Sequence, residues 1–215
     1  MTGKSPTCAL VAASDFNVGN FRVCDAAGAF DCVVAVDAGF AQLESIHRVP
    51  DFVLGDFDSL GFVPKGANVA VHPSHKDESD LELALCYVEE KGFERVVVYG
   101  ALGGRLDHTV AALQSCARCA EVGMEVSLVG AETAVHILAG PGTFEISGIE
   151  AGTVSVFSAT DVSLGVTELG MEYPLENACL TNRTALGLSN ELVGKPASVS
   201  VERGTLYIFH PLPVL

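Results

Sequence analysis

The chain has 215 residues, which suffices for one large domain or two small ones. Apolar residues make up 49% of it and charged residues 18%, a composition that is ordinary for a globular protein and excludes extensive disorder. Because the formal net charge is -15, we expect neither nucleic acid nor anionic lipid as a partner. No apolar run reaches membrane-spanning length, so we expect no membrane association.

The seven cysteines are an odd number without the spacing of a secreted scaffold, which indicates reduced thiols and a cytoplasmic protein. Cys116 and Cys119 form a C-x-x-C inside an apolar helical pattern, with no second ligand pair nearby. Helix packing therefore explains this pair better than zinc binding or redox chemistry does. The apolar run at 8–13 follows a lysine, but it is short for a signal peptide and is better interpreted as a strand.

Short apolar runs rich in β-branched residues alternate with segments of helical spacing in the first part of the chain. Such alternation is typical of a parallel sheet covered by helices on both faces. We therefore predict a Rossmann-like α/β domain over residues 1–133. Its strands are expected at 8–13, 32–36, 52–54, 69–71, 95–99 and 125–129, and its helices at 39–47, 79–91 and 107–122.

The pattern changes after residue 133, where short strand-like runs are separated by glycine-containing turns and no helical spacing remains. This pattern favours a small antiparallel domain over residues 134–215, folded as a β-sandwich. The strands are expected at 134–138, 142–147, 153–158, 161–168, 197–202 and 205–210.

Two aspartates, Asp56 and Asp58, directly follow the strand predicted at 52–54. Residues two apart in extended chain point to the same side, and ligands of open α/β sheets bind beyond the carboxyl ends of the strands. Close carboxylates repel each other unless a proton or a cation lies between them, and Mg²⁺ prefers such oxygen ligands. An acidic turn explains the same residues, so this segment alone leaves both interpretations open.

A second acidic segment begins the helix predicted at 79–91. Asp77 or Ser79 is suited to cap this helix, and Asp77 and Asp80 share a face at its first turn. Helix N-termini favour aspartate for structural reasons alone, but that explanation does not account for Lys76.

A third segment, Gly103-Gly104-Arg105-Leu106-Asp107-His108, follows the strand at 95–99 closely. Its glycines allow the backbone to approach a ligand, and the following helix offers free N–H groups to an anion. Arg105 is suited to hold a phosphate, and Asp107 to join the metal ligands. The alternative is a tight turn with a capping aspartate.

Asp37-Ala38-Gly39 follows the strand at 32–36, so four segments are expected to meet at one edge of the sheet. The chain has neither a Walker A motif nor a G-x-G-x-x-G fingerprint, so a nucleotide would be held by another device.

These segments resemble the bacterial type of thiamine pyrophosphokinase. The motifs that carry the resemblance occur in the order of that family between residues 37 and 191. They are Asp37-Ala-Gly39, Gly55-Asp-Phe-Asp-Ser59, Lys76-Asp-Glu-Ser-Asp-Leu-Glu-Leu-Ala-Leu85, Gly103-Gly-Arg-Leu-Asp-His108 and Gly187-Leu-Ser-Asn-Glu191. Ala38 replaces a glycine that is usual in the family, Ser79 replaces a threonine, and the chain has no tryptophan to form a wall for thiamine.

The resemblance implies a homodimer with sites at the subunit interface. It also implies Mg²⁺-dependent transfer of pyrophosphate from ATP to the hydroxyl of thiamine, which gives thiamine diphosphate and AMP. The implied catalytic residues are Asp56, Asp58, Asp80 and Asp107, of which Asp56, Asp58 and Asp80 would be the metal ligands. The implied ligand-binding residues are Asp37, Gly39, Ser59, Lys76, Asp77, Gly104, Arg105, His108, Ser189 and Asn190, the last two near thiamine.

Two other functions compete with this one. The first is a Mg²⁺-dependent pyrophosphoryl transferase that acts on another alcohol, such as a pterin alcohol. The second is a sensor that binds nucleotide or thiamine diphosphate without turnover, which would not need the full set of aspartates.

Overall fold

The computed structural model describes residues 5–55, 68–71 and 78–213. Its contacts divide the chain into two compact units. The first consists of Met1–Cys119 with Leu128–Ala131, and the second of Ala120–Ser127 with Glu132–Leu215. Within the described residues, no helix is long and apolar enough to cross a membrane.

Parallel strands form the centre of the first unit, in the order β5-β1-β2-β3-β4. Their bounds are β1 Thr7–Val11, β2 Cys32–Val36, β3 Phe52–Gly55, β4 Asn68–Val71 and β5 Arg95–Tyr99, and β6 follows at Glu125–Val129. The chain proceeds from β1 to β4 on one side and then crosses back, so that β5 lies on the other side of β1. The strand order thus reverses between β1 and β5, and such a reversal opens a crevice at the carboxyl ends of the strands.

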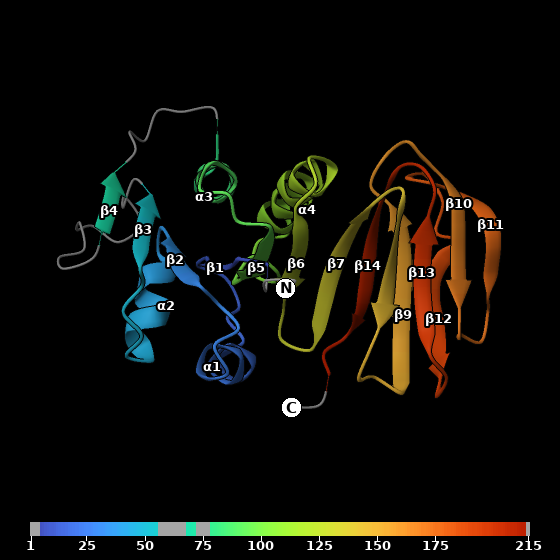
Figure 1. Cartoon of the computed structure of the whole chain (residues 1–215), viewed down its shortest axis with the longest axis horizontal. Helices are drawn as coiled ribbons and strands as arrows, with labels where there is room; N and C mark the ends of the chain where they lie inside the picture. Colours follow the sequence, from blue (N-terminus) through green and yellow to red (C-terminus); the bar gives the residue numbers. More distant parts are fainter. Residues whose placement is uncertain (1–4, 56–67, 72–77, 214–215) are drawn as a thin grey trace. The chain divides into compact units, whose positions relative to one another are not determined.

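Helices cover both faces of these strands. Figure 1 shows α1 and α2 on one face and α3 and α4 on the other. The bounds are α1 Val18–Ala26, α2 Gly39–Ser45, α3 Asp80–Glu90 and α4 Leu106–Glu121. The bounds of β1 to β6 and of the helices α2, α3 and α4 lie within two residues of those predicted from the sequence. The sequence did not predict α1, because only Asn20 and Phe21 are buried in it and two buried residues leave no helical apolar pattern.

Cys116 and Cys119 are fully buried on the inner face of α4. Burial raises the pKa of the Cys119 thiol to about 11 and raises that of Cys116 further. Both thiols are therefore protonated apolar side chains, as the helix-packing interpretation predicts.

The second unit contains only antiparallel pairs among its strands β7 to β14, in the orders β12-β9-β14-β7 and β11-β10-β13-β8. The bounds are β7 Thr133–Ala139, β8 Gly142–Ile146, β9 Ala151–Ser158, β10 Val162–Leu169, β11 Leu175–Thr181, β12 Gly187–Val193, β13 Ala197–Val201 and β14 Thr205–Pro211. One hydrophobic cluster takes side chains from both sheets, including Val154, Val156, Val166, Leu180, Val199 and Ile208.

Two strands of this unit, β11 and β12, were not predicted from the sequence. Only Leu180 of β11 is buried, and β12 has a shift of register between Gly187 and Asn190. Neither strand therefore shows the strict alternation of apolar and polar residues that identifies a half-buried strand.

Candidate active site

A cavity of about 550 Å³ lies at the carboxyl ends of the parallel strands in the first unit. It is lined by residues that follow β1, β2 and β5 and by the first turns of α3 and α4. They are Ala12, Ala13, Ser14, Val36, Asp37, Ala38, Ser79, Asp80, Leu81, Gly100, Ala101, Asp107, His108, Ala111 and Ala112. The crevice at the reversal of strand order is thus a real cavity, and three of the predicted site aspartates line it.

Hydrogen bonds between the segments after β1 and β5 build the floor of this cavity. The Ala12 N–H donates to the Tyr99 carbonyl over 2.9 Å, and the Ser14 N–H donates to the Gly100 carbonyl over 2.8 Å. Gly100 has a φ of +66°, and a Cβ there would overlap the Ala12 carbonyl oxygen. The two segments can approach this closely only because residue 100 is glycine.

Asp37 ends β2 in the left-handed conformation, with a φ of 46°, and its N–H donates to the Leu54 carbonyl over 2.7 Å. Its Oδ1 atom is buried, and the described part of the chain offers that atom no hydrogen-bond partner. Gly39 places α2 against β1, because a Cβ there would overlap the Val11 carbonyl. A buried carboxylate oxygen without a partner is costly, so this atom is suited to a cation or to a donor of a ligand.

The first turn of α3 brings Asp80 to the cavity. Ser79 caps the helix by a reciprocal pair of bonds, in which its Oγ accepts from the Glu82 N–H over 3.3 Å and Glu82 Oε2 accepts from the Ser79 N–H over 2.8 Å. Of the two residues that the sequence suggested as caps, Asp77 and Ser79, it is therefore Ser79 that caps α3. The N-terminus of an α-helix favours anions, so this end of α3 suits a phosphate group.

Arg105 and Asp107 form an exposed ion pair at the start of α4. Arg105 Nη2 lies 2.6 Å from Asp107 Oδ2, and Arg105 Nε donates to Asp107 Oδ1 over 3.1 Å. The guanidinium of Arg105, together with the N–H of His108, lowers the pKa of Asp107 to about 2. Asp107 is therefore ionised at neutral pH, and its carboxylate is suited to bind a cation.

The glycine pair before α4 lies against the segment that follows β1. A Cβ on Gly104, whose φ is +61°, would lie 2.7 Å from Ser14 Oγ, and a Cβ on Gly103 would overlap the Asp15 carboxylate. Ser14 Oγ is buried without a hydrogen-bond partner in the described part of the chain. Ser14 was not among the site residues predicted from the sequence, and its position after β1 is the only signal that could have identified it.

Several predicted site residues lie outside the described residues. These are Asp56, Asp58, Ser59, Lys76 and Asp77. Within the described residues, no group of three His, Cys, Asp or Glu side chains is arranged to hold a metal ion. The carboxylates of Asp37, Asp80 and Asp107 nevertheless line one cavity, and oxygen donors of this kind fit Mg²⁺.

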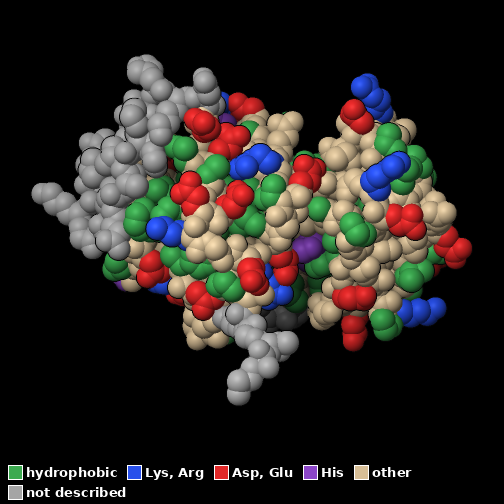
Figure 2. All heavy atoms as spheres, turned by 45° about the horizontal axis from the view of Figure 1, so that its top comes forward, with side chains coloured by type: hydrophobic (Ala, Val, Ile, Leu, Met, Phe, Trp, Pro, Cys, Tyr) green, Lys and Arg blue, Asp and Glu red, His purple; other side chains and the backbone are tan. Residues whose placement is uncertain are grey.

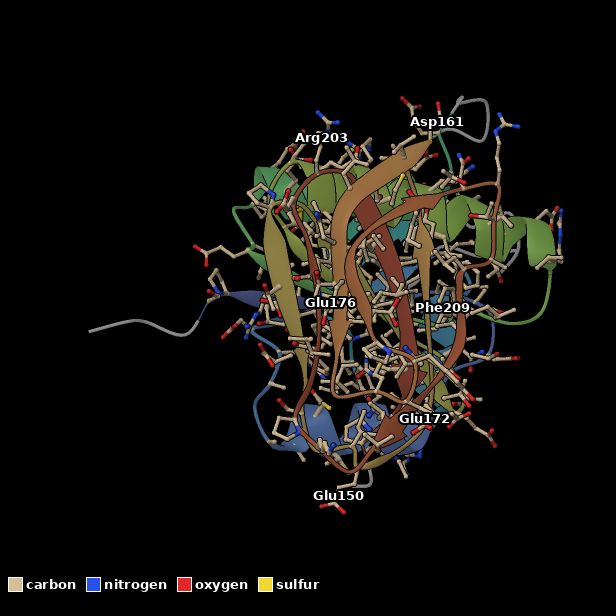
Figure 3. All side chains as sticks on the ribbon, turned by 90° about the vertical axis from the view of Figure 1, so that its right-hand side faces the viewer. Glu150, Asp161, Glu172, Glu176, Arg203 and Phe209 are labelled. Carbon is tan, nitrogen blue, oxygen red and sulfur yellow. The ribbon has the colours of Figure 1, made fainter. Side chains whose placement is uncertain are left out.

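A second cavity, of about 490 Å³, lies in the second unit and contains Ser189 and Asn190. It is lined by Glu168, Glu172, Tyr173, Pro174, Leu175, Leu186, Gly187, Leu188, Ser189 and Asn190. Figure 3 shows Glu172 at one end of this unit's strands, and Asp161 and Arg203 at the other end. Tyr173 is 65% exposed, an unusual state for an aromatic residue, and it was not among the site residues predicted from the sequence.

Ser189 and Asn190 have different states in this cavity. Ser189 is exposed with a φ of 60°, and its N–H donates to Ser155 Oγ over 3.0 Å. Asn190 is buried, and both its Oδ1 and its Nδ2 atoms make hydrogen bonds within the protein.

Acidic side chains are spread over the face of the molecule drawn in Figure 2 and do not gather in a single patch. On this face, therefore, the acidic side chains do not mark out a single site.

Two family models match the chain. "Thiamin pyrophosphokinase, catalytic domain" matches residues 25–128, and "Thiamin pyrophosphokinase, vitamin B1 binding domain" matches residues 143–206. Among curated proteins, thiamine pyrophosphokinase of Bacillus subtilis (strain 168) is 28% identical over 180 residues, which cover 80% of this chain and 84% of that protein. Thiamin pyrophosphokinase 1 of Caenorhabditis elegans is 29% identical over 173 residues, covering 74% of this chain and 70% of that protein.

Solved structures show the same fold. Thiamine pyrophosphokinase from Bacillus subtilis superposes with a TM-score of 0.80 at 23% identity, covering 97% of this chain and 100% of that one. Thiamin pyrophosphokinase from Geobacillus thermodenitrificans also gives a TM-score of 0.80, at 24% identity, covering 96% of this chain and 97% of that one. Because two models of one family together match most of the sequence, the chain belongs to the thiamin pyrophosphokinase family.

Proposed function

We propose that this protein transfers the pyrophosphoryl group of ATP to the hydroxyl of thiamine, giving thiamine diphosphate and AMP. The observation that carries the proposal is the convergence of Asp37, Asp80 and Asp107, from three separate elements, on one cavity at the carboxyl end of the parallel strands. The domains that the family models describe as catalytic and as binding vitamin B1 match the two parts of the chain in that order.

The first-unit cavity is the proposed site for the triphosphate. The N-terminus of α3 faces it through Ser79 and Asp80, and Arg105 at the start of α4 is the proposed phosphate contact. Gly39, Gly104 and His108 are proposed to shape the site, with Ser59, Lys76 and Asp77 as further contacts. Asp56, Asp58 and Asp80 are the proposed ligands of Mg²⁺, which when bound would neutralise phosphate charge.

The reaction needs a proton acceptor and in-line geometry more than it needs a protein nucleophile. The thiamine hydroxyl oxygen forms a bond to the β-phosphorus, and the bond from that phosphorus to the oxygen bridging to the α-phosphorus breaks. AMP leaves with that bridging oxygen, and the hydroxyl proton is released. Asp107 is the proposed acceptor because its carboxylate lines the cavity.

The second-unit cavity is the proposed site for thiamine, near Ser189 and Asn190. The exposed ring of Tyr173 lies on the lining of this cavity, and an aromatic face attracts a cation such as the thiazolium ring. Tyr173 is therefore the proposed wall of the thiamine site in a chain without tryptophan.

The domain organisation is part of the proposal. Residues 1–133 would form a Rossmann-like catalytic domain, and residues 134–215 a β-sandwich that binds thiamine. The common hydrophobic cluster of the two antiparallel sheets supports the sandwich. We further propose a cytoplasmic homodimer with its sites at the subunit interface, as the family resemblance implies.

The decisive experiment incubates the protein with ATP, thiamine and Mg²⁺ and identifies the products by mass. We expect thiamine diphosphate and AMP, and no product when EDTA is present. Formation of ADP would indicate simple kinase chemistry, and turnover of a pterin alcohol in place of thiamine would indicate a different pyrophosphoryl transferase. Binding without turnover would indicate a sensor.

A pair of variants tests the metal ligands. Asp56→Asn should remove most of the turnover and leave the fold intact, because the metal would lose a charged ligand. Asp161→Asn is the matched control, since Asp161 is exposed and lines neither cavity. Equal turnover in both variants would refute the role of Asp56.

A further inference from the structure

One buried carboxyl group of the second unit has no part in the proposed chemistry. Glu168 lies on β10 with its side chain on the same face as Val166, and none of its surface is exposed. The residue also lines the proposed thiamine cavity, beneath its exposed rim. Glutamate is rarely buried in this way, because desolvation of a carboxylate is costly.

Asn190 holds this carboxyl group in place. Its Nδ2 donates to Glu168 Oε2 over 2.7 Å and to the Tyr173 carbonyl over 2.8 Å. Its Oδ1 accepts from the N–H groups of Tyr173 and Glu191, each over 3.0 Å. An asparagine amide has two donors and one acceptor oxygen with two lone pairs, so these four bonds use its full capacity.

This saturation changes the role expected of Asn190. Since no polar group of its side chain is free, it is a positioning residue that fixes the Tyr173 backbone and one oxygen of Glu168. The other oxygen, Glu168 Oε1, is buried and has no hydrogen-bond partner within the described part of the chain. The protonated acid would need an acceptor for its proton, and the described residues provide none at Oε1.

A purely structural role explains this arrangement poorly. Burial raises the pKa of Glu168, whereas the hydrogen bond from Asn190 lowers it. Because the burial effect is the larger, the fold is less stable with an ionised glutamate here than it would be with a neutral side chain of the same shape. A group that lowers stability and lies under a cavity is more readily explained by function.

We propose that Glu168 makes the second-unit cavity selective for a cationic ligand, by placing a buried negative charge under the floor of the cavity. The inference rests on the proposed function, in which that ligand is thiamine and its cationic part is the thiazolium ring. Glu168 does not need to touch the ligand, because an unscreened charge acts through the protein interior over longer distances than an exposed one does. A neutral ring of the same shape would gain no binding affinity from the charge of Glu168.

Two ligands and three proteins test this inference. The ligands are thiamine and its analogue with a neutral thiophene ring in place of the thiazolium ring. The proteins are the full-length wild type, Glu168→Gln and Glu176→Gln. Glutamine keeps the shape of Glu168 and can still accept from Asn190. Glu176→Gln removes the same charge from an exposed position in the same unit that is not part of the cavity lining.

The measurements are the dissociation constant of each ligand by calorimetry and the KM and kcat for each as acceptor. We expect Glu168→Gln to weaken binding of thiamine by about tenfold or more and of the neutral analogue by less than about twofold, because only the cation loses a Coulomb attraction. We expect Glu176→Gln to change both constants by less than about twofold, because water screens an exposed charge. A melting temperature of Glu168→Gln at or above that of the wild type would show that the variant folds.

An equal loss for both ligands in Glu168→Gln, or no loss for either, would overturn the inference. If the wild type pyrophosphorylates thiamine while Glu168→Gln shows no charge selectivity, this inference alone fails. If the wild type neither binds nor uses thiamine, the proposed function fails as well.

Discussion

The floor of the first-unit cavity depends on the close approach of the segments after β1 and β5, and Gly100→Ala perturbs this approach directly. The new methyl group would overlap the Ala12 carbonyl oxygen and would require an L-residue at a φ of +66°. The conformational cost is about 1–2 kcal/mol, and overpacking against a fixed backbone adds about 1–3 kcal/mol. We therefore expect the free energy of unfolding to fall by about 2–5 kcal/mol, the sum of these two costs.

Gly92→Ala is the matched control. Gly92 also has a positive φ, of +76°, but a Cβ there would meet no atom within 4 Å. This variant should therefore lose only the conformational part, about 1–2 kcal/mol. For a protein of this size each kcal/mol lowers the melting temperature by about 2–4 °C, so we expect falls of about 4–20 °C for Gly100→Ala and about 2–8 °C for Gly92→Ala.

Thermal and urea unfolding followed by circular dichroism at 222 nm measures both variants. The described helices lie almost wholly in the first unit, so the helical signal reports on the unit that contains both glycines. Equal destabilisation of the two variants would refute the reasoning, because it would show that the approach of Ala12 to Gly100 imposes no constraint beyond the φ value.

The remaining predictions concern single side chains. Ser79→Ala should lower the free energy of unfolding by about 1 kcal/mol in urea titrations, because α3 loses its N-cap, and an unchanged midpoint would contradict this. Arg105→Met should raise the pKa of Asp107 from about 2 toward its ordinary value of ~3.9, as measured by NMR titration of the carboxyl carbon. In the wild type, any contribution of the ion pair to stability is present above that ordinary value and is lost as the pH falls through about 2. Asn190→Ala should lower the free energy of unfolding by about 1–3 kcal/mol for each buried group that it leaves unpaired, so a variant with native stability and only a raised thiamine KM would refute its positioning role. Tyr173→Ala should raise the thiamine KM by about 2- to 30-fold and Tyr173→Phe should not, because the ring face and not the hydroxyl attracts the cation.

The strands and helices of the first unit could be predicted because their apolar residues are local and periodic. The strands at 32–36, 95–99 and 125–129 have the predicted bounds, since each is rich in apolar residues and is followed by a polar residue or a glycine. Helix α1 and strands β11 and β12 could not be predicted, because what stabilises them is distant in sequence. The Asn17 side chain, for example, caps α1 and also donates to the carbonyl groups of Gly130 and Ala131.

The sequence by itself determined the order of the motifs, the family resemblance and the aspartates of the candidate site, because these depend on residue type and spacing. Only the tertiary structure decided which of them share a cavity, since the convergence of Asp37, Asp80 and Asp107 follows from the strand order β5-β1-β2 and not from their separation along the chain. It also decided that Asn190 is saturated and that Glu168 is buried beneath the second cavity. A hydrogen bond between residues 22 positions apart, on strands β10 and β12, leaves no local pattern in the sequence, and so Glu168 could not be identified before the fold was known.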